Sequence, residues 1–227
     1  MLRRCLQNLR MYTDVPYDLI IVEGLYDGFT GPIISELRKN DKHIKFKNNI
    51  SIPKALNMVI RKAKTEYITL MSNDTFVQEG WFTELKKALD DTDYSFVGPL
   101  HTAYPHDQWE IIREEAKDRF YTNNSTFGFI CLTGTTFKKD SWSKVGPFEE
   151  KLPFFYFDRD YQQQINDAGM SCGWVYKAVV TTLLNMTWYE DNDYGNERLF
   201  GKHKNYWSHK QHAKEADFFF KKWGRVP

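Results

Sequence analysis

The sequence has few cysteines and no surplus of charge of either sign. Its 227 residues contain three cysteines, Cys5, Cys131 and Cys172, which stand far apart. Such a scattered, odd-numbered set matches neither the paired spacing of a zinc site nor the disulfide framework of a small secreted domain. The 31 basic and 30 acidic residues leave a net charge of +1, so the composition does not favour nucleic acid as a partner.

Long hydrophobic runs are missing as well. No stretch approaches the ~20 apolar residues that span a bilayer, and the first residues lack the pattern of a signal peptide. Together with the cysteine content, this predicts a cytoplasmic protein without a transmembrane segment. The aromatic and basic tail from Phe218 to Arg225 is still compatible with a peripheral contact at a membrane surface. No pattern indicates an oligomeric state.

Strand and helix patterns alternate through the first hundred residues. Apolar spacing predicts helices over 2–9, 31–39 and 52–63 and another from Trp81, with strands at 18–22, 43–46, 67–71 and 94–100. This alternation is typical of an α/β fold with a mainly parallel central sheet flanked by helices. No linker interrupts the chain, so we expect a single domain over 1–227.

The second half continues less regularly. After a polar excursion over 101–126, strand character returns at 127–132 and 174–184. Helices are expected at 136–145 and at 158–168, the latter closed by Gly169 at a position that favours glycine.

A short polar segment with one acidic residue follows the predicted strand 67–71. Ser72, Asn73 and Asp74 stand where the carboxyl end of a strand would meet a ligand, and oxygen ligands there suit Mg²⁺ or Mn²⁺. The alternative is that Asp74 and Thr75 only begin a turn or cap the next helix.

Two further acidic groups allow a similar choice. Asp158 and Asp160 open a predicted helix after an aromatic run, so they are either first-turn charges or include a general base. Glu23 and Asp27 follow the first predicted strand, where they either form a turn or bind the ribose or base of a nucleotide.

Five segments, in order, resemble glycosyltransferase family 2, whose members have the GT-A fold. They are LRRCLQNL, DLIIVEGLYDG, IPKALNMVIRKAKTEYITLMSNDTFVQEGW, GTTFKKDSWSKVGPFEEKLPFFYFDRDYQQQINDAG and FFKKWG. The resemblance covers nearly the whole chain. It implies a GT-A type, Rossmann-like fold with a nucleotide-binding half over 1–100 and an acceptor-binding half over 101–227.

The resemblance also implies roles for individual residues. Asp74 matches the metal ligand on the donor diphosphate, with Asn73 beside it in the DxD-type motif. Glu23 and Asp27 match the acids of the nucleoside-binding turn. Asp158 matches the catalytic base, with Asp160 two residues further on.

Three departures from the family pattern stand out. The opening strand is missing ahead of the first helix, and Phe157 replaces the first acid of the ED-type pair. Thr182 occupies the place of a frequent histidine in the family. Three histidines lie downstream, at positions His203, His209 and His212. They are either candidates to replace it or simply solvated side chains in a Lys-rich segment.

The sequence therefore predicts a metal-dependent inverting glycosyltransferase. It would use Mn²⁺ or Mg²⁺ and a nucleotide-diphosphate sugar donor, and it would act on a glycan or other hydroxyl acceptor, as in polysaccharide biosynthesis. One alternative is a non-catalytic GT-A-like module that binds a sugar or a protein. Another is a nucleotidyltransferase, although no Gly-rich basic phosphate loop is visible.

Overall fold

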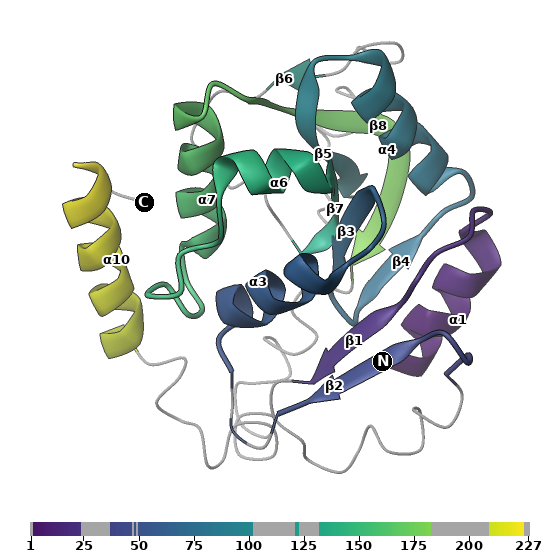
Figure 1. Ribbon diagram of the computed structural model, residues 1–227, viewed down its shortest axis with the longest axis horizontal. Helices are drawn as coiled ribbons and strands as arrows, with labels where there is room; N and C mark the ends of the chain where they lie inside the picture. Colours follow the sequence, from purple (N-terminus) through teal and green to yellow (C-terminus); the bar gives the residue numbers. More distant parts are fainter. Residues whose placement is uncertain are drawn as a thin grey trace.

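The computed structural model describes residues 2–23, 37–46, 48, 50–101, 121–122, 132–182 and 209–224, and its helices surround two separate sheets (Figure 1). The helices are α1 (Leu2–Tyr12), α3 (Ile52–Lys62), α4 (Trp81–Asp91), α6 (Lys139–Val145), α7 (Phe157–Asp167) and α10 (His209–Trp223). The strands are β1 (Ile20–Glu23), β2 (Lys42–Lys45), β3 (Tyr67–Met71), β4 (Thr75–Val77), β5 (Tyr94–His101), β6 (Tyr121–Thr122), β7 (Thr133–Lys138) and β8 (Ser171–Thr182).

The sheets confirm the α/β class but correct the expected strand arrangement. In the small sheet, β1 and β2 are parallel. The large sheet has the order β3-β7-β5-β8-β4, with β6 also on β8, and within it only β5 and β8 pair in parallel. The described part of the chain therefore holds a split, mixed sheet rather than one mainly parallel sheet. Hydrophobic spacing reports which side chains are buried and carries no information on strand direction.

Several helices begin and end where the sequence predicts. Ser51 caps α3 by accepting a hydrogen bond from the Lys54 amide at 3.4 Å, and Pro53 occupies the first turn. α7 ends at Asp167, and Gly169 follows with a φ of 68°, the left-handed conformation that favours glycine. These local signals fix helix ends independently of tertiary contacts.

Two predicted boundaries need correction. β7 occupies residues 133–138, so the helix expected from Thr136 begins only at Lys139. Buried threonines hide this strand from a hydrophobicity pattern, and the Thr136 hydroxyl lies 2.9 Å from that of Thr69 on β3. The strand expected at 127–132 falls almost entirely outside the described residues. Of the helix expected at 31–39, only 37–39 are described, and these are not helical.

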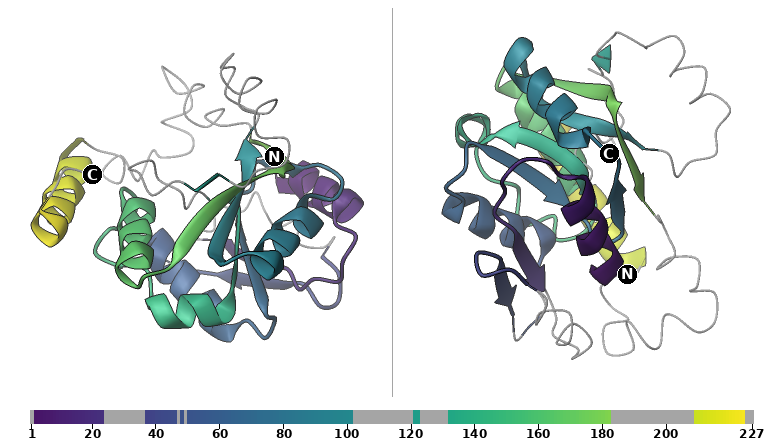
Figure 2. Two further views of the ribbon diagram at one scale, coloured as in Figure 1. Left: turned by 90° about the horizontal axis from the view of Figure 1, so that it is seen from above. Right: turned by 90° about the vertical axis from the view of Figure 1, so that its right-hand side faces the viewer.

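The core has one cluster on each face of the large sheet. Phe96 and Phe137 pack with Tyr161 of α7, with Phe96 and Phe137 ring centroids 5.0 Å apart. Val97, the neighbour of Phe96, faces the other way and packs with Leu85 of α4. α1 and α10 lie at opposite ends of the molecule (Figure 2). None of the described helices is long and apolar enough to cross a membrane.

Candidate functional site

Three predicted site segments are linked through α3. β1 ends at Glu23, and its parallel neighbour β2 leads from the same edge into the start of α3. β3 follows α3 after a short loop and runs back along it, so Met71 returns to that edge. The Ile52 amide, at the start of α3, donates to the Pro153 carbonyl at 3.2 Å, just before α7. The ends of β1 and β3 therefore lie at one edge, and the loop that leads into α7 contacts the start of α3.

Asp74 is held in a tight polar turn after β3. The Ser72 hydroxyl donates to Oδ1 of Asp74 and lies 2.8 Å from the Thr75 hydroxyl. Asn73 is exposed and Asp74 half-buried, so both are accessible to a ligand. The capping alternative is wrong, because β4 intervenes and Gly80 is the N-cap of α4. The prediction that Asp74 and Thr75 form a turn is confirmed, since the Thr75 amide lies 3.4 Å from the Ser72 carbonyl.

This turn offers one carboxylate to a cation. The described residues contain no group of three or more His, Cys, Asp or Glu side chains placed to hold a metal ion. Mg²⁺ and similar cations commonly take one or two protein carboxylates and complete their shell with phosphate and water oxygens. A single accessible Asp74 fits that mode of binding.

Glu23 is engaged inside the small sheet. Its Oε2 lies 3.0 Å from Nε2 of His43 on β2, and each side chain is 8% exposed. The pair fixes the carboxylate at the end of β1, and its contact with a nucleoside stays a prediction. Sequence reasoning gave no role to His43, because the pairing of β1 with β2 is what brings it to Glu23. Asp27 lies outside the described residues.

Asp158 lies in the first turn of α7 with an altered affinity for protons. Burial raises the pKa of its carboxyl group, and the Arg159 amide, which donates to Oδ1 at 2.8 Å, partly offsets the rise. The residue before the helix, Tyr156, has a φ of 59°, so the backbone adopts a left-handed conformation just before α7 begins. A carboxylate whose pKa is raised toward the working pH suits a general base.

Asp160 has a different task. It is fully buried and binds α10 to α7, because it accepts from Lys222 Nζ at 2.7 Å and Trp223 Nε1 at 2.8 Å. Phe157 is also a core residue, with its ring edge-on to Phe148 at 6.3 Å. In the segment that resembles the ED-type motif, Asp158 is therefore the one carboxylate without a structural role that could act as a general base.

Two residues of α10 support the site: Glu215, to which the sequence gave no role, and His212, one of the histidine candidates. Glu215 is buried and accepts from the amides of Phe154 and Phe155 at 3.2 and 2.8 Å. His212 hydrogen-bonds to the Tyr156 hydroxyl. α10 therefore holds the aromatic run that leads into Asp158. No local pattern could reveal this, because these contacts join residues about 60 positions apart.

The other histidine candidates are only partly placed. His203 and the side chain of His209 lie outside what the structure describes. Thr182 ends β8, and its backbone pairs with Thr75 of β4. The position where the family often has histidine therefore lies next to the turn that carries Asp74.

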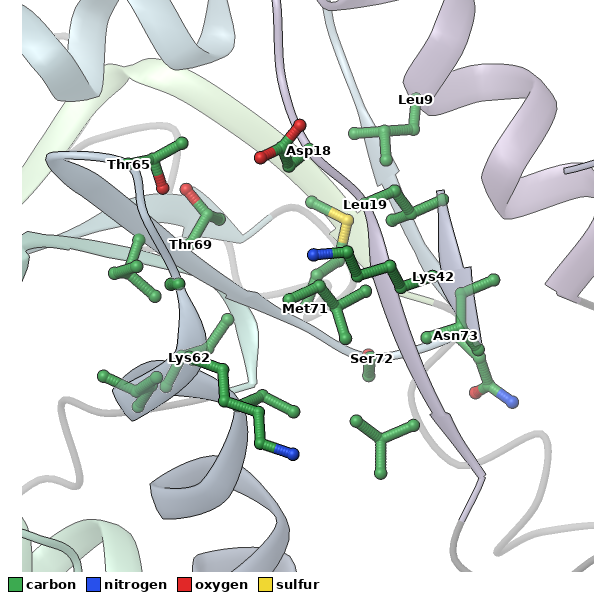
Figure 3. A pocket seen from close by; sticks show the side chains of 18 of the residues that line it. Leu9, Asp18, Leu19, Lys42, Lys62, Thr65, Thr69, Met71, Ser72 and Asn73 are labelled. Carbon is green, nitrogen blue, oxygen red and sulfur yellow. The ribbon is translucent and has the colours of Figure 1, made fainter. Parts of the chain in front are cut away.

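A cavity of about 460 Å³ adjoins this edge (Figure 3). Ser72 and Asn73 line one part of it, and residues of α1, β1, α3 and β3 line the rest. The cavity thus reaches from the space between the two sheets to the candidate metal turn.

Comparisons with solved structures support the fold. The chain superposes on GalNAc-T7 with UDP, GalNAc and Mn²⁺ at a TM-score of 0.65 and 12% identity, covering 80% of this chain and 40% of that one. It superposes on S. aureus TarS 1–349 in complex with UDP-GlcNAc at a TM-score of 0.61 and 13% identity, covering 80% and 54%. The chain thus spans about half the length of these proteins or less. At such low identity, these matches establish the GT-A-like α/β fold alone.

Sequence comparison gives the family. No curated protein sequence matches the chain. The profile described as Glycosyl transferase family 2 matches residues 1–180, which is well over half of the 227 residues. The resemblance of the first four sequence segments is thereby confirmed, whereas FFKKWG lies beyond the matched residues. The chain belongs to glycosyl transferase family 2.

Proposed function

We propose that the chain transfers a sugar from a nucleotide-diphosphate sugar to a hydroxyl acceptor, with inversion at the anomeric carbon and with the help of Mn²⁺ or Mg²⁺. The observation that carries this proposal is the accessible Asp74 carboxylate in the turn after β3, beside the cavity that Ser72 and Asn73 line. Family membership supports the reaction class. Residues 1–100 would supply the donor side and residues 101–227 the acceptor side.

The side chains have complementary tasks in this reaction. The acceptor oxygen attacks the anomeric carbon, and its proton passes to the Asp158 carboxylate. The bond from that carbon to the diphosphate oxygen breaks, and the diphosphate leaves with the electron pair. A cation at Asp74 would offset the negative charge of the diphosphate. Glu23 would contact the nucleoside at the end of β1.

The choice of nucleotide follows the solved relatives. The GalNAc-T7 structure is described with UDP and Mn²⁺, and one TarS structure is described in complex with UDP. UDP is therefore the first ligand to test, with GDP and CDP as comparisons. The acceptor is proposed to be a glycan, and the site of action the cytoplasm or the face of a membrane.

A calorimetric titration of UDP, with and without Mn²⁺, tests the donor site. We expect Mn²⁺-dependent binding by the wild type and its loss in Asp74→Asn, because the amide replaces the anionic ligand. Asp217→Asn is the matched control. It makes the same change at an exposed residue of α10, and it should bind like the wild type. If UDP binds equally well without Mn²⁺ and to the Asp74→Asn variant, the assignment of Asp74 as a metal ligand is wrong.

Phe157 favours a second candidate function. The first acid of the ED-type pair is replaced by a buried aromatic residue, which is consistent with a GT-A-like module that binds a nucleotide sugar without transferring it. Radiolabelled UDP-sugars distinguish the two functions. Binding without hydrolysis or transfer, across a panel of donors and glycan acceptors, would favour the binding module.

A further inference from the structure

β4 is a short edge strand that begins at the residue after Asp74. It comprises only Thr75–Val77 and, among the strands that the structure describes, it pairs with β8 alone. A strand at the edge of a sheet leaves polar backbone groups unpaired on its outer side. The position of the Asp74 carboxylate therefore depends on what holds the outer side of β4.

The backbone of Val77 faces away from β8. Val77 stands opposite Val180 in the antiparallel register, and the next amide, that of Gln78, donates to the Val179 carbonyl at 3.2 Å. Opposed residues in an antiparallel pair alternate between those that exchange hydrogen bonds and those that do not. Because Gln78 bonds with β8, the N–H and C=O groups of Val77 point toward the outer side of β4.

The side chain of Asn8 on α1 pairs with both of these groups. Its Nδ2 donates to the Val77 carbonyl at 3.1 Å, and its Oδ1 accepts from the Val77 amide at 2.6 Å. A carboxamide offers the same donor and acceptor as a peptide group, so Asn8 takes the place of a neighbouring strand. Asparagine is a poor helix former because its side chain competes for backbone hydrogen bonds. Its place inside α1 is explained by this contact with a residue 69 positions away.

α1 lies beside β4 (Figure 1). It also contacts the chain ahead of Asp74. Cys5 stands three residues before Asn8 and therefore on the same face of the helix, and its Sγ donates to the Ser72 carbonyl at 3.8 Å. One face of α1 thus contacts the chain on both sides of Asp74, at Ser72 and at Val77.

The metal turn, Ser72–Thr75, is held together by its own hydrogen bonds. The Ser72 hydroxyl donates to Asp74 and lies 2.8 Å from the Thr75 hydroxyl. These bonds fix the shape of the turn but not its place in the fold. That place is set by β8 on one side of β4 and by α1 on the other, where Asn8 supplies the paired hydrogen bonds.

We propose that Asn8 is a positioning residue for the metal turn. By holding Val77 at the outer side of β4, it keeps the Asp74 carboxylate where a cation on the donor diphosphate can reach it. Asn8 acts through the backbone of β4 and does not itself supply a ligand. This inference rests on the proposed function, because it assumes that Asp74 carries the Mn²⁺-dependent part of UDP binding.

Calorimetry and amide hydrogen exchange on Asn8→Ala test this role. We expect the Val77 amide to exchange about tenfold faster, because it loses its acceptor. The factor by which Mn²⁺ strengthens UDP binding should fall about tenfold, since residues that support a metal ligand commonly change metal affinity by that order. UDP affinity measured without Mn²⁺ should not change, and this split distinguishes positioning from a general loss of stability.

Two further variants accompany Asn8→Ala. Gln7→Ala is the matched control, because it removes a carboxamide from the neighbouring, exposed position of α1, and it should match the wild type in both measurements. Asn8→Asp has nearly the same size as the wild type. It keeps the acceptor for the Val77 amide and loses the donor to the Val77 carbonyl. It should therefore reduce the effect of Mn²⁺ while protecting the Val77 amide better than Asn8→Ala does.

Two results would overturn the inference. In the first, the Val77 amide exchanges at the wild-type rate in Asn8→Ala, so Asn8 does not hold β4. In the second, Val77 exchanges faster but the factor contributed by Mn²⁺ is unchanged, so the contact is structural only. Either result leaves the proposed function intact, whereas a wild type without Mn²⁺-dependent UDP binding would contradict the proposed function and this inference together.

Discussion

Asp158 and Asp160 stand two residues apart in the first turn of α7, yet their surroundings give them different tasks. Asp160 is surrounded by donors from α10 and acts as an anchor. Asp158 is desolvated, and Arg159 is the next residue. Both residues are aspartates in the same helical turn, so the sequence alone cannot tell an anchor from a base. The groups that surround each carboxylate in the fold determine its role.

Replacing Asp158 with asparagine should separate catalysis from donor binding. Asparagine can still accept the Arg159 amide hydrogen bond but cannot take a proton from the acceptor. We expect kcat to fall by about 10²–10⁴ with the affinity for UDP unchanged. Asp167→Asn, an exposed change on the same helix, is the control and should leave kcat near the wild-type value. A decrease of similar size in both variants would contradict the assignment.

The same variant should be more stable than the wild type at neutral pH. Because the folded-state pKa of Asp158 is raised, the folded protein binds more protons than the unfolded chain between the two pKa values. Wild-type stability therefore falls as pH rises through that window, and Asp158→Asn escapes this loss. Thermal unfolding at several pH values should show a Tm advantage at pH 7 that shrinks toward pH 3. A constant difference would exclude titration of Asp158 as its source.

At the scale of elements, sequence patterns found most helices and the strands β1, β2, β3, β5 and β8, but not the pairing of strands. Apolar spacing and caps are local, which explains the success with α3 and α7. β7 escaped because its core positions are threonines, and β4 because three residues are too few to show a period. The acidic turn at Asp74 could be found because its residues are adjacent. The support from Glu215 could not, because it depends on how α10 packs.

The attachment of α10 makes a prediction for its buried carboxylate. Asp160→Ala leaves Trp223 Nε1 and Lys222 Nζ without their main acceptor, although Lys222 keeps Glu149 at 3.7 Å. We expect the free energy of unfolding to fall by about 2–3 kcal/mol. The exposed pair of Asp217 and Lys221 on the same helix supplies the control, and Asp217→Ala should cost less than about 0.5 kcal/mol. Urea unfolding that shows equal losses would contradict the anchor role.

At the scale of the whole molecule, the fold is a glycosyltransferase framework in two unequal parts. The large sheet is covered on both faces by packed clusters. The small sheet, by contrast, consists of two strands that pair only with each other within the described chain. An isolated two-stranded sheet is marginally stable in water, so β1 and β2 depend on α1, α3 and the cavity walls for their order.

This division predicts two levels of stability within one chain. In native-state hydrogen exchange at increasing urea concentrations, the Ile21 amide on β1 should exchange through a local opening. The free energy of that opening should depend only weakly on urea concentration. Val97 and Phe137, in the centre of the large sheet, should exchange through global unfolding. If Ile21 and Val97 follow one urea dependence, then the two sheets unfold as a single unit and the split does not weaken β1.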